Sequence, residues 1–279
     1  MTWASISAPP GVLPPRPITM RVQSIPPRHE FPEHAHDWHQ VAYAIDGALM
    51  VTAESRSFVI SPDQAVWLPS GVSHRVGSLL GAEFRSLWIA VDAGRNLPSA
   101  PTVLAVSPLL KELIVEAAAI ERSQDSDGYP ERVATLILDQ LRRAQSLTTG
   151  LPWPRGGRLL RLCEALYIDP ADARSSSEWA KALGMSSRTL TRQFEAEMGL
   201  SLRSWRRKLR LLRAIELLSS GTAVTETAMQ LGYGSASAFV FAFRTEMGAS
   251  PHAYMRKATG AYRASSPIPP KLRRQNSRR

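Results

Sequence analysis

The feature that most constrains this 279-residue chain is a pair of short helices joined by a glycine turn, a pattern that occurs twice in its C-terminal half. The first copy, SSSEWAKALGMSSRTLTRQF, has Ser175 and Glu178 at the spacing of a capping box and a turn at Gly184. In its second helix, Leu190 and Phe194 are four residues apart and share one face. The segment therefore predicts a helix-turn-helix unit.

The second copy, VTETAMQLGYGSASAFVFAFR, makes the pattern specific. Ala228 repeats Ala180 at an offset of 48, whereas Phe239 repeats Leu190 at an offset of 49, so the second turn is one residue longer. A single unit of this kind fits any helical hairpin, but two at this spacing indicate a paired DNA-binding unit. The run between them predicts one helix with Trp205, Leu209, Leu212 and Leu217 inward and Arg206, Arg207, Lys208 and Arg210 outward.

The net charge of +10 is unevenly divided along the chain. Residues 1–155 carry 13 basic and 15 acidic groups, residues 156–258 carry 15 and 9, and the tail 259–279 carries 6 and none. The net charges are therefore −2, +6 and +6, which favours a polyanionic partner for the C-terminal half, although membranes and acidic proteins also attract basic surfaces. We predict a disordered tail that is either a solvated terminus or a sequence-independent contribution to DNA affinity.

The C-terminal half resembles the AraC/XylS family of transcription regulators over about 100 residues, in QFEAEMGLS and in LGYGSASAFVFAFRTEMGASPHAYMR. The resemblance implies two small helical lobes joined by a long helix, with recognition helices in successive major grooves of bent double-stranded DNA. It implies DNA contacts from Ser187, Arg188, Thr189, Thr191 and Arg192, and from Ser235, Ser237, Phe241 and Arg244.

The two recognition helices differ in chemistry. Arg188 and Arg192 fall opposite the apolar face of the first, and an arginine fork can bond guanine O6 and N7. The exposed positions of the second are predicted to be Ala236, Ser237, Val240 and Phe241. Phe241 either touches a thymine methyl or a neighbouring lobe, or adds packing. We expect the first helix to read most of the sequence and the second to position the protein on phosphates.

The N-terminal half predicts a small β-barrel followed by helices. Residues 1–28 are rich in proline and predict an irregular arm. Short apolar runs separated by turn residues then predict strands, and helical spacing begins at Ser107. The two helices expected between there and residue 150 either pack on the barrel or form a dimer seam, and we favour the seam.

Two motifs in this half resemble the cupin family. HAHDWHQVAYAIDG places His34 and His36 on one face of a strand, with Gln40 where the cupin motif has an acid, and PSGVSH supplies His74. Three imidazoles converging in a barrel suit Zn²⁺, Ni²⁺ or Fe²⁺, with Gln40 as a neutral fourth ligand. The alternative is a polar pocket in which these side chains bind an organic effector directly. Trp38 and Trp67, with Trp88, Met50 and Phe58, either line that pocket or form ordinary core.

These patterns predict an α+β chain of two domains: an N-terminal cupin-like β-barrel with a helical linker, and an all-α C-terminal domain with two helix-turn-helix units. The expected parts are a sensor at 1–95, a dimerisation linker at 96–155, a DNA-binding domain at 156–258 and the tail. We predict a sequence-specific regulator controlled by a small-molecule or metal effector. It is expected to be a homodimer, with RNA polymerase as a partner if it activates.

The alternative is a metal-dependent cupin enzyme, a dioxygenase or isomerase with a helical appendage. The glutamine at position 40, the doubled helix-turn-helix and the absence of a supported catalytic motif argue against it. One cysteine, no signal peptide and no apolar run near the roughly 20 residues of a membrane span predict a cytoplasmic protein without a membrane partner.

Overall fold

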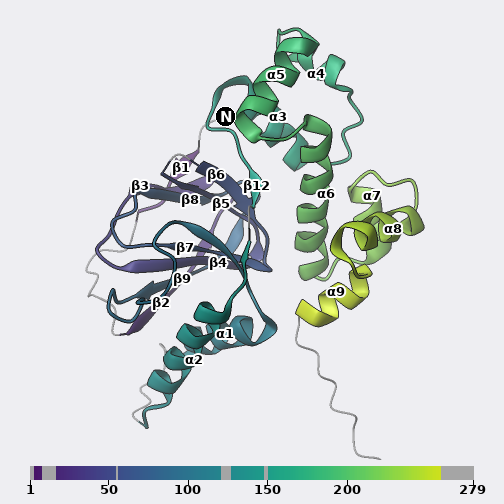
Figure 1. Ribbon diagram of the computed structural model, residues 1–279. Helices are drawn as coiled ribbons and strands as arrows, with labels where there is room; N and C mark the ends of the chain where they lie inside the picture. The colour runs from purple at the N-terminus through teal and green to yellow at the C-terminus, as the bar shows by residue number, and fades with distance from the viewer. Residues whose placement is uncertain (1–2, 8–16, 55, 121–126, 148–149, 259–279) are drawn as a thin grey trace, which may run out of the picture.

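A computed structural model describes residues 3–7, 17–54, 56–120, 127–147 and 150–258. The basic tail and Pro9 to Pro15 of the expected arm lie outside the described residues. Figure 1 shows a β-rich N-terminal half with two helices at one end and a helical C-terminal half beside it.

The β-rich half consists of two six-stranded sheets that face each other. In one sheet the order is β1 (Ala4–Ser5), β3 (His29–His34), β8 (His74–Ser78), β5 (Leu49–Ala53), β6 (Arg56–Ile60) and β12 (Leu151–Pro152). In the other it is β11 (Ser146–Leu147), β10 (Thr102–Ala105), β7 (Gln64–Leu68), β4 (His39–Gly47), β9 (Ala82–Ile89) and β2 (Ile18–Ile25). The predicted barrel is therefore not closed, because the sheets remain separate and pack through apolar inner faces.

The expectation that residues 1–28 are irregular is wrong for part of this range. Strand β2 pairs antiparallel with β9 along its whole length, from Ile18 opposite Ile89 to Ile25 opposite Ala82. The strand fits between Pro17 and Pro26, so no proline interrupts its ladder. The arm thus supplies an edge strand to the second sheet.

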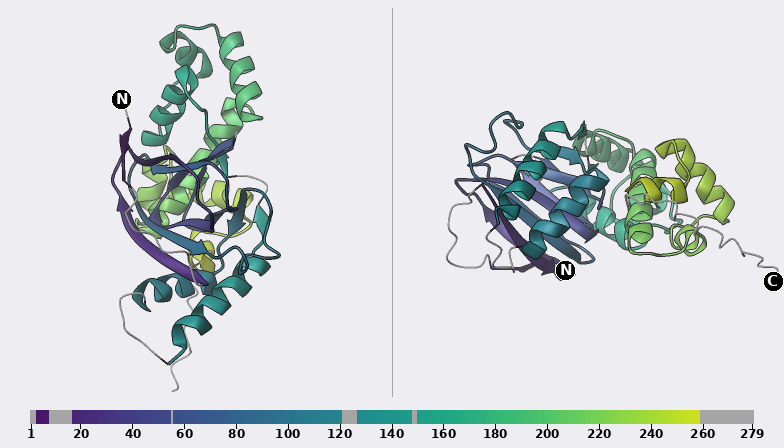
Figure 2. Two further views of the ribbon diagram at one scale, coloured as in Figure 1. Left: turned by 90° about the vertical axis from the view of Figure 1, so that its left-hand side faces the viewer. Right: turned by 90° about the horizontal axis from the view of Figure 1, so that it is seen from below.

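Helices α1 (Pro108–Ile120) and α2 (Tyr129–Arg143) cover the outer face of the second sheet (Figure 2). Their buried residues, among them Leu110, Ile114 and Ile137, pack against Tyr43 and Trp67 of the sheet. This confirms packing on the β half. Other apolar side chains of these helices remain outside: Leu109, Val115 and Leu136 are 52%, 42% and 47% exposed.

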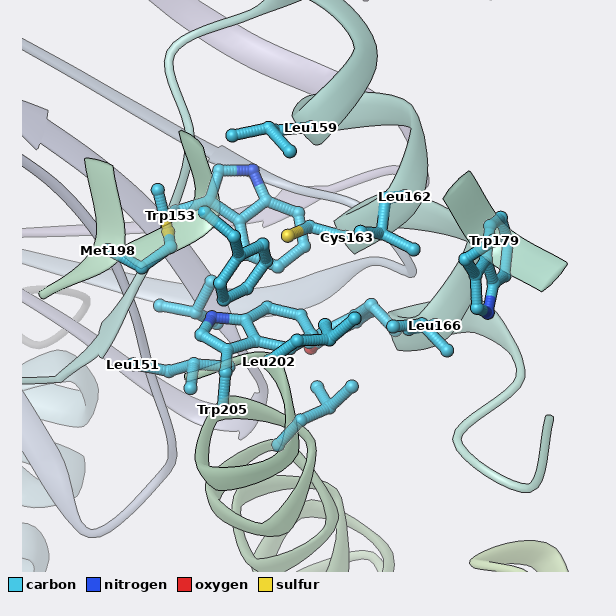
Figure 3. Packing of buried hydrophobic residues seen from close by; sticks show 14 of the residues in the cluster. Leu151, Trp153, Leu159, Leu162, Cys163, Leu166, Trp179, Met198, Leu202 and Trp205 are labelled. Atoms are coloured by element: carbon cyan, nitrogen blue, oxygen red, sulfur yellow. The ribbon is translucent and has the colours of Figure 1, made fainter. Parts of the chain in front are cut away.

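The C-terminal half has two helical lobes that share one long helix, as Figure 1 shows. The first lobe contains α3 (Gly157–Ile168), α4 (Ser176–Ala182) and α5 (Ser187–Met198), and the second contains α7 (Val224–Gln230), α8 (Ala236–Met247) and α9 (Pro251–Ala258). Helix α6 (Leu202–Ser219) runs between them and contributes to both cores. Figure 3 shows Trp153, Cys163 and Trp205 packed together in the first lobe.

The basic residues of α6 are only partly available to a ligand, which corrects the expectation that all four point outward. Arg206 donates to the carbonyl oxygens of Asp172 and Arg174, and Arg210 donates to that of Pro170. These contacts hold the loop between α3 and α4. Arg207 pairs with Glu246 of α8 at 3.2 Å, whereas Lys208 is exposed. Leu217, expected inward, is half-buried.

The two halves touch at several points. Trp205 donates from its indole nitrogen to the carbonyl of Pro152 in β12 at 2.8 Å. Arg28 and Trp3 of the β half both contact the carboxylate of Glu164 on α3, each at 3.3 Å. Among the described helices, none is long and apolar enough to span a membrane.

Candidate DNA-binding surface and effector cavity

The first helix-turn-helix forms as its sequence predicts. Ser175 accepts a hydrogen bond from the backbone N–H of Glu178, and the Glu178 carboxylate accepts one from the backbone N–H of Ser175, so the capping box is complete. Gly184 has a φ of 65°, which suits glycine at the turn. Ser186 then caps α5, whose Leu190 and Phe194 are buried. These features fix which face of α5 points away from the lobe.

The outer face of α5 carries the residues predicted to contact DNA. Ser187, Arg188, Thr191 and Arg192 are exposed, and Thr189 is half-buried. Within the described part of the chain, neither Arg188 nor Arg192 forms an ion pair, so both guanidinium groups face solvent with their donors free. This arrangement suits base edges and phosphates in a major groove.

The second unit repeats the geometry with fewer polar groups. Gly232 has a φ of 74°, and a Cβ atom there would lie 2.9 Å from the Cα of Ala171, so both the backbone and the close approach require glycine. Ser235 caps α8 through the backbone N–H of Ala238, and Phe239 and Phe243 are buried. The recognition helix α8 is therefore capped and anchored in the same way as α5.

The outer face of α8 partly matches its prediction. Ser235, Ser237 and Arg244 are exposed, and Phe241 is 75% exposed, so the alternative that Phe241 packs within the lobe is wrong. Ala236 and Val240, expected to be exposed, are half-buried against the lobe core. The predicted residues of this face thus offer two hydroxyls, one guanidinium and one aromatic ring.

A cavity of about 610 Å³ lies between the two sheets of the β half. Its walls combine residues of β2, β3, β8 and β9 with Gln40 of β4 and the segment before that strand. Of the predicted site residues, His34, His36, Trp38 and Gln40 line it, and Trp88 does so as well. The size lies within the usual range of small-molecule sites.

Three histidines cluster at this cavity. One ring nitrogen from each of His34, His36 and His74 lies within 4.8 Å of the others. Their Nδ1 atoms contact the backbone carbonyls of Pro32, Trp38 and Val72 at 2.7, 2.8 and 2.8 Å. Because a carbonyl only accepts, each Nδ1 carries a proton, which leaves Nε2 as the acceptor of each neutral ring.

His74 is the most buried member of this cluster. Burial lowers the pKa of His74 to about 4, so its ring is neutral near pH 7. Its Nε2 atom is buried and has no hydrogen-bond partner among the described residues. A lone pair held in this way suits a metal ion or the polar hydrogen of a ligand.

Gln40 connects the histidine cluster to the second sheet. Its Oε1 atom lies 3.0 Å from Nε2 of His36, and its amide nitrogen donates to Oγ of Ser86 at 2.7 Å. In the tautomer with the proton on Nδ1, Nε2 of His36 is an acceptor, and it faces a second acceptor in Oε1 of Gln40. A cation bound to both atoms satisfies this contact, and so does rotation of the amide, which places its NH₂ group on His36.

Sequence reasoning missed part of the cavity and misplaced three aromatic or apolar residues. Trp67 is fully buried on the opposite face of its sheet, under α1, and donates to the carbonyl of Pro98 at 2.7 Å. Met50 and Phe58 pack elsewhere in the core. The missed lining residues include Arg21 and Ser86. The alternation of β2 and β9 would have indicated these two had β2 been recognised, since they are directly opposite each other in the ladder.

A β domain that encloses a ligand-sized cavity, joined to two helix-turn-helix units, defines a transcription regulator with a ligand-binding domain. Comparisons with known proteins agree. Residues 20–187, more than half of the chain, match the AraC-like ligand binding domain family, and residues 179–257 match the Helix-turn-helix domain family. The chain belongs to the AraC family of transcription regulators.

Individual relatives are regulators as well. The HTH-type transcriptional regulator NimR of Escherichia coli is 31% identical over 228 residues, which cover 82% of this chain and 83% of NimR. RipA of Corynebacterium glutamicum is 34% identical over 120 residues, 43% of this chain and 36% of RipA. Among solved structures, ToxT of Vibrio cholerae bound to an unsaturated fatty acid matches 88% of this chain and 96% of its own, with 14% identity and a TM-score of 0.38.

Proposed function

We propose that this regulator binds specific sites in double-stranded DNA and that a small-molecule effector in the β-domain cavity controls this binding. The sensor comprises residues 1–95 with the linker 96–155, and residues 156–258 bind DNA in the cytoplasm. Its relatives favour this function over a metal-dependent dioxygenase or isomerase. The observation that carries the proposal is the outer face of α5, where Arg188 and Arg192 are exposed and unpaired among the described residues.

The two recognition helices have different roles in DNA binding. Arg188, Thr191 and Arg192 of α5 read bases, with Ser187 and Thr189 at the helix start. On α8, Ser235, Ser237 and Arg244 hold phosphates, because this face offers few groups that distinguish bases. Phe241 contacts a thymine methyl or a neighbouring protein surface.

Occupancy of the organism's own chromosome tests this proposal. Wild-type protein should give a few sharp peaks at promoters, and the double variant Arg188→Ala, Arg192→Ala should lose them. In vitro, Arg188→Ala should weaken the free energy of binding to DNA from one of these peaks by about 1–3 kcal/mol, and that to random DNA by much less. Arg161→Ala, which removes the same charge from an exposed position on α3, is the matched control. Equal losses on specific and random DNA would contradict base reading by Arg188.

The exposed apolar side chains of α1 and α2 support a homodimer. Leu109, Val115 and Leu136 are uncovered in the monomer, and burying them against a second copy would stabilise a dimer. Sedimentation of wild-type protein and of Leu136→Glu tests this, since the variant should sediment as a monomer. If the regulator activates transcription, RNA polymerase is its further partner.

The effector site comprises the cavity residues His34, His36, Trp38 and Gln40, together with His74, whose ring contacts those of His34 and His36. The three Nε2 atoms, with Oε1 of Gln40 as a neutral fourth ligand, form a donor set that fits a divalent metal such as Zn²⁺, Ni²⁺ or Fe²⁺. The carbonyl contacts of the Nδ1 atoms orient the rings, as the outer contacts of metal-binding histidines usually do. A bound metal would supply a Lewis acid at one end of the cavity.

Metal analysis of purified protein tests this donor set. Wild-type protein incubated with Zn²⁺ and dialysed should retain about one equivalent, and His34→Ala should lose it. His252→Ala, an exposed histidine on α9, should retain the metal. Retention of one equivalent by His34→Ala would exclude the cluster as the site.

A further inference from the structure

The cavity is lined by side chains whose buried donors have no hydrogen-bond partner in the part of the chain that the structure describes. Nε of Arg21 and Nε1 of Trp38 are both buried without a hydrogen bond among the described residues, and both side chains line the cavity. A buried donor without a partner costs roughly 1–3 kcal/mol, so a ligand that accepts from it gains the difference. Two such donors in one cavity point to a ligand with strong acceptor atoms.

The charge of the cavity points to an anion. Among the described residues that line the cavity, Arg21 carries a permanent positive charge, and none is aspartate or glutamate. In the part of the chain that the structure describes, its guanidinium makes no ion pair and instead lies 4.8 Å from the ring centre of Trp88. A guanidinium without a carboxylate partner favours a carboxylate on the ligand, because the planar fork matches its two oxygens.

The remaining walls are apolar and rich in rings. Trp38 lies with its ring centre 5.1 Å from that of Trp88 and stacks on His36 at 4.8 Å with an interplanar angle of 9°. The ring centres of Phe31 and Phe84, which come from opposite sheets, lie 5.8 Å apart. Flat aromatic walls favour a flat apolar ligand, because ring faces contact it over a large area.

We propose that the effector is an aromatic carboxylate, with its carboxylate bound to Arg21 and Trp38 and its ring system against Trp88 and Phe84. The proposal rests on the assignment of this cavity as the effector site. It requires no metal. Arg21 is positioned for the role by β2, where it lies opposite Ser86 of β9, so Arg21 lies on the same face of the second sheet as Phe84 and Trp88.

Binding of 1-naphthoate and its neutral analogue 1-naphthamide to the full chain tests the proposal, with calorimetry in EDTA as the measurement. We expect saturable binding of naphthoate and about 10- to 100-fold weaker binding of naphthamide. Arg21→Ala should weaken the binding of naphthoate by a similar factor and leave the binding of naphthamide unchanged. The affinity of Arg21→Lys for naphthoate should fall between those of wild type and Arg21→Ala. Arg56→Ala, an exposed arginine of the same domain outside the cavity, should match wild type.

Four outcomes would overturn the proposal. The first three are no saturable binding of naphthoate, equal binding of acid and amide, and binding of decanoate as tight as that of naphthoate. Naphthoate binding that requires added Zn²⁺ and survives Arg21→Ala would assign the anion to the histidine cluster and would also overturn it. DNA binding by Arg21→Ala without ligand, measured in parallel, separates a wrong ligand class from a wrong assignment of the protein as a regulator.

Discussion

The phenol of Tyr167 donates a 2.7 Å hydrogen bond to the carboxylate of Glu216, and both residues are buried. The other carboxylate oxygen of Glu216 binds Arg213. Burial raises the pKa of Glu216, and Arg213 and Tyr167 oppose this effect. The contact joins α3 of the first lobe to the part of α6 that enters the second lobe. It therefore fixes the direction in which α6 leaves the first lobe.

We expect Tyr167→Phe to destabilise the DNA-binding half by about 1.5–3 kcal/mol, because a buried carboxylate loses one of its two partners. Urea unfolding of the full chain measures this change. Tyr233→Phe, which removes a hydroxyl that makes no described hydrogen bond, should change the free energy of unfolding by less than about 0.5 kcal/mol. Equal effects of the two variants would mean that the Glu216 contact contributes nothing.

The sequence predicted the helix-turn-helix units well because their signals are local. The capping box at Ser175, the turn glycine at position 184 and the apolar spacing of Leu190 and Phe194 all lie within one short segment. The histidine cluster was also predictable from local motifs, although β3 ends at His34 and His36 lies outside the strand that the sequence predicted for both.

The environment of residues whose partners are distant in sequence could not be predicted in the same way. Arg21 reaches the cavity because β2 pairs with β9, and the prolines around β2 concealed that strand. Trp67 is an aromatic residue of the type expected in a ligand pocket, but it lies on the face of its sheet that α1 covers. Arg206 and Arg210 have the spacing of an exposed basic face, yet a loop whose carbonyls need donors covers them. In each case a partner distant in sequence decides the environment.

Gln40→Glu should raise the affinity for Zn²⁺ by about tenfold or more, because it adds a negative charge at the atom that lies 3.0 Å from Nε2 of His36. Competition with a chromophoric chelator measures this affinity. Gln23→Glu is the matched control, since Gln23 lines the same cavity, makes no described contact with the histidines, and gains the same charge on substitution. If both variants bind Zn²⁺ equally well, the gain is general electrostatics and Gln40 is not a ligand.

Phe241→Ala should leave the free energy of unfolding within about 0.5 kcal/mol of wild type, because the ring is 75% exposed. On a specific DNA site the same variant should bind several-fold more weakly, and replacing the contacted thymine by uracil should remove that difference. Fluorescence anisotropy with the two DNAs measures both effects. A loss that persists on uracil DNA would place Phe241 against another surface.

Tyr254 of α9 donates its hydroxyl to the carboxylate of Asp63, just before β7, and so ties the second lobe to the β domain. Burial and the nearby Asp63 raise the pKa of Tyr254, so it remains the donor at any working pH. The centre of the Tyr254 ring lies 5.5 Å from that of the Phe243 ring, a contact that Tyr254→Phe retains. The substitution should therefore loosen the lobe from the β domain without unfolding it.

A double-mutant cycle of Tyr254→Phe and Asp63→Ala isolates this contact from the other roles of each residue, because Asp63 also accepts from Ser61. We expect a coupling energy of about 0.5–3 kcal/mol in the stability of the full chain. Hydrogen exchange should rise in residues 251–256 but not in the buried part of α8. A coupling energy near zero would show that this hydrogen bond does not hold the lobe to the β domain, and that loss of the tyrosine hydroxyl leaves the two halves docked.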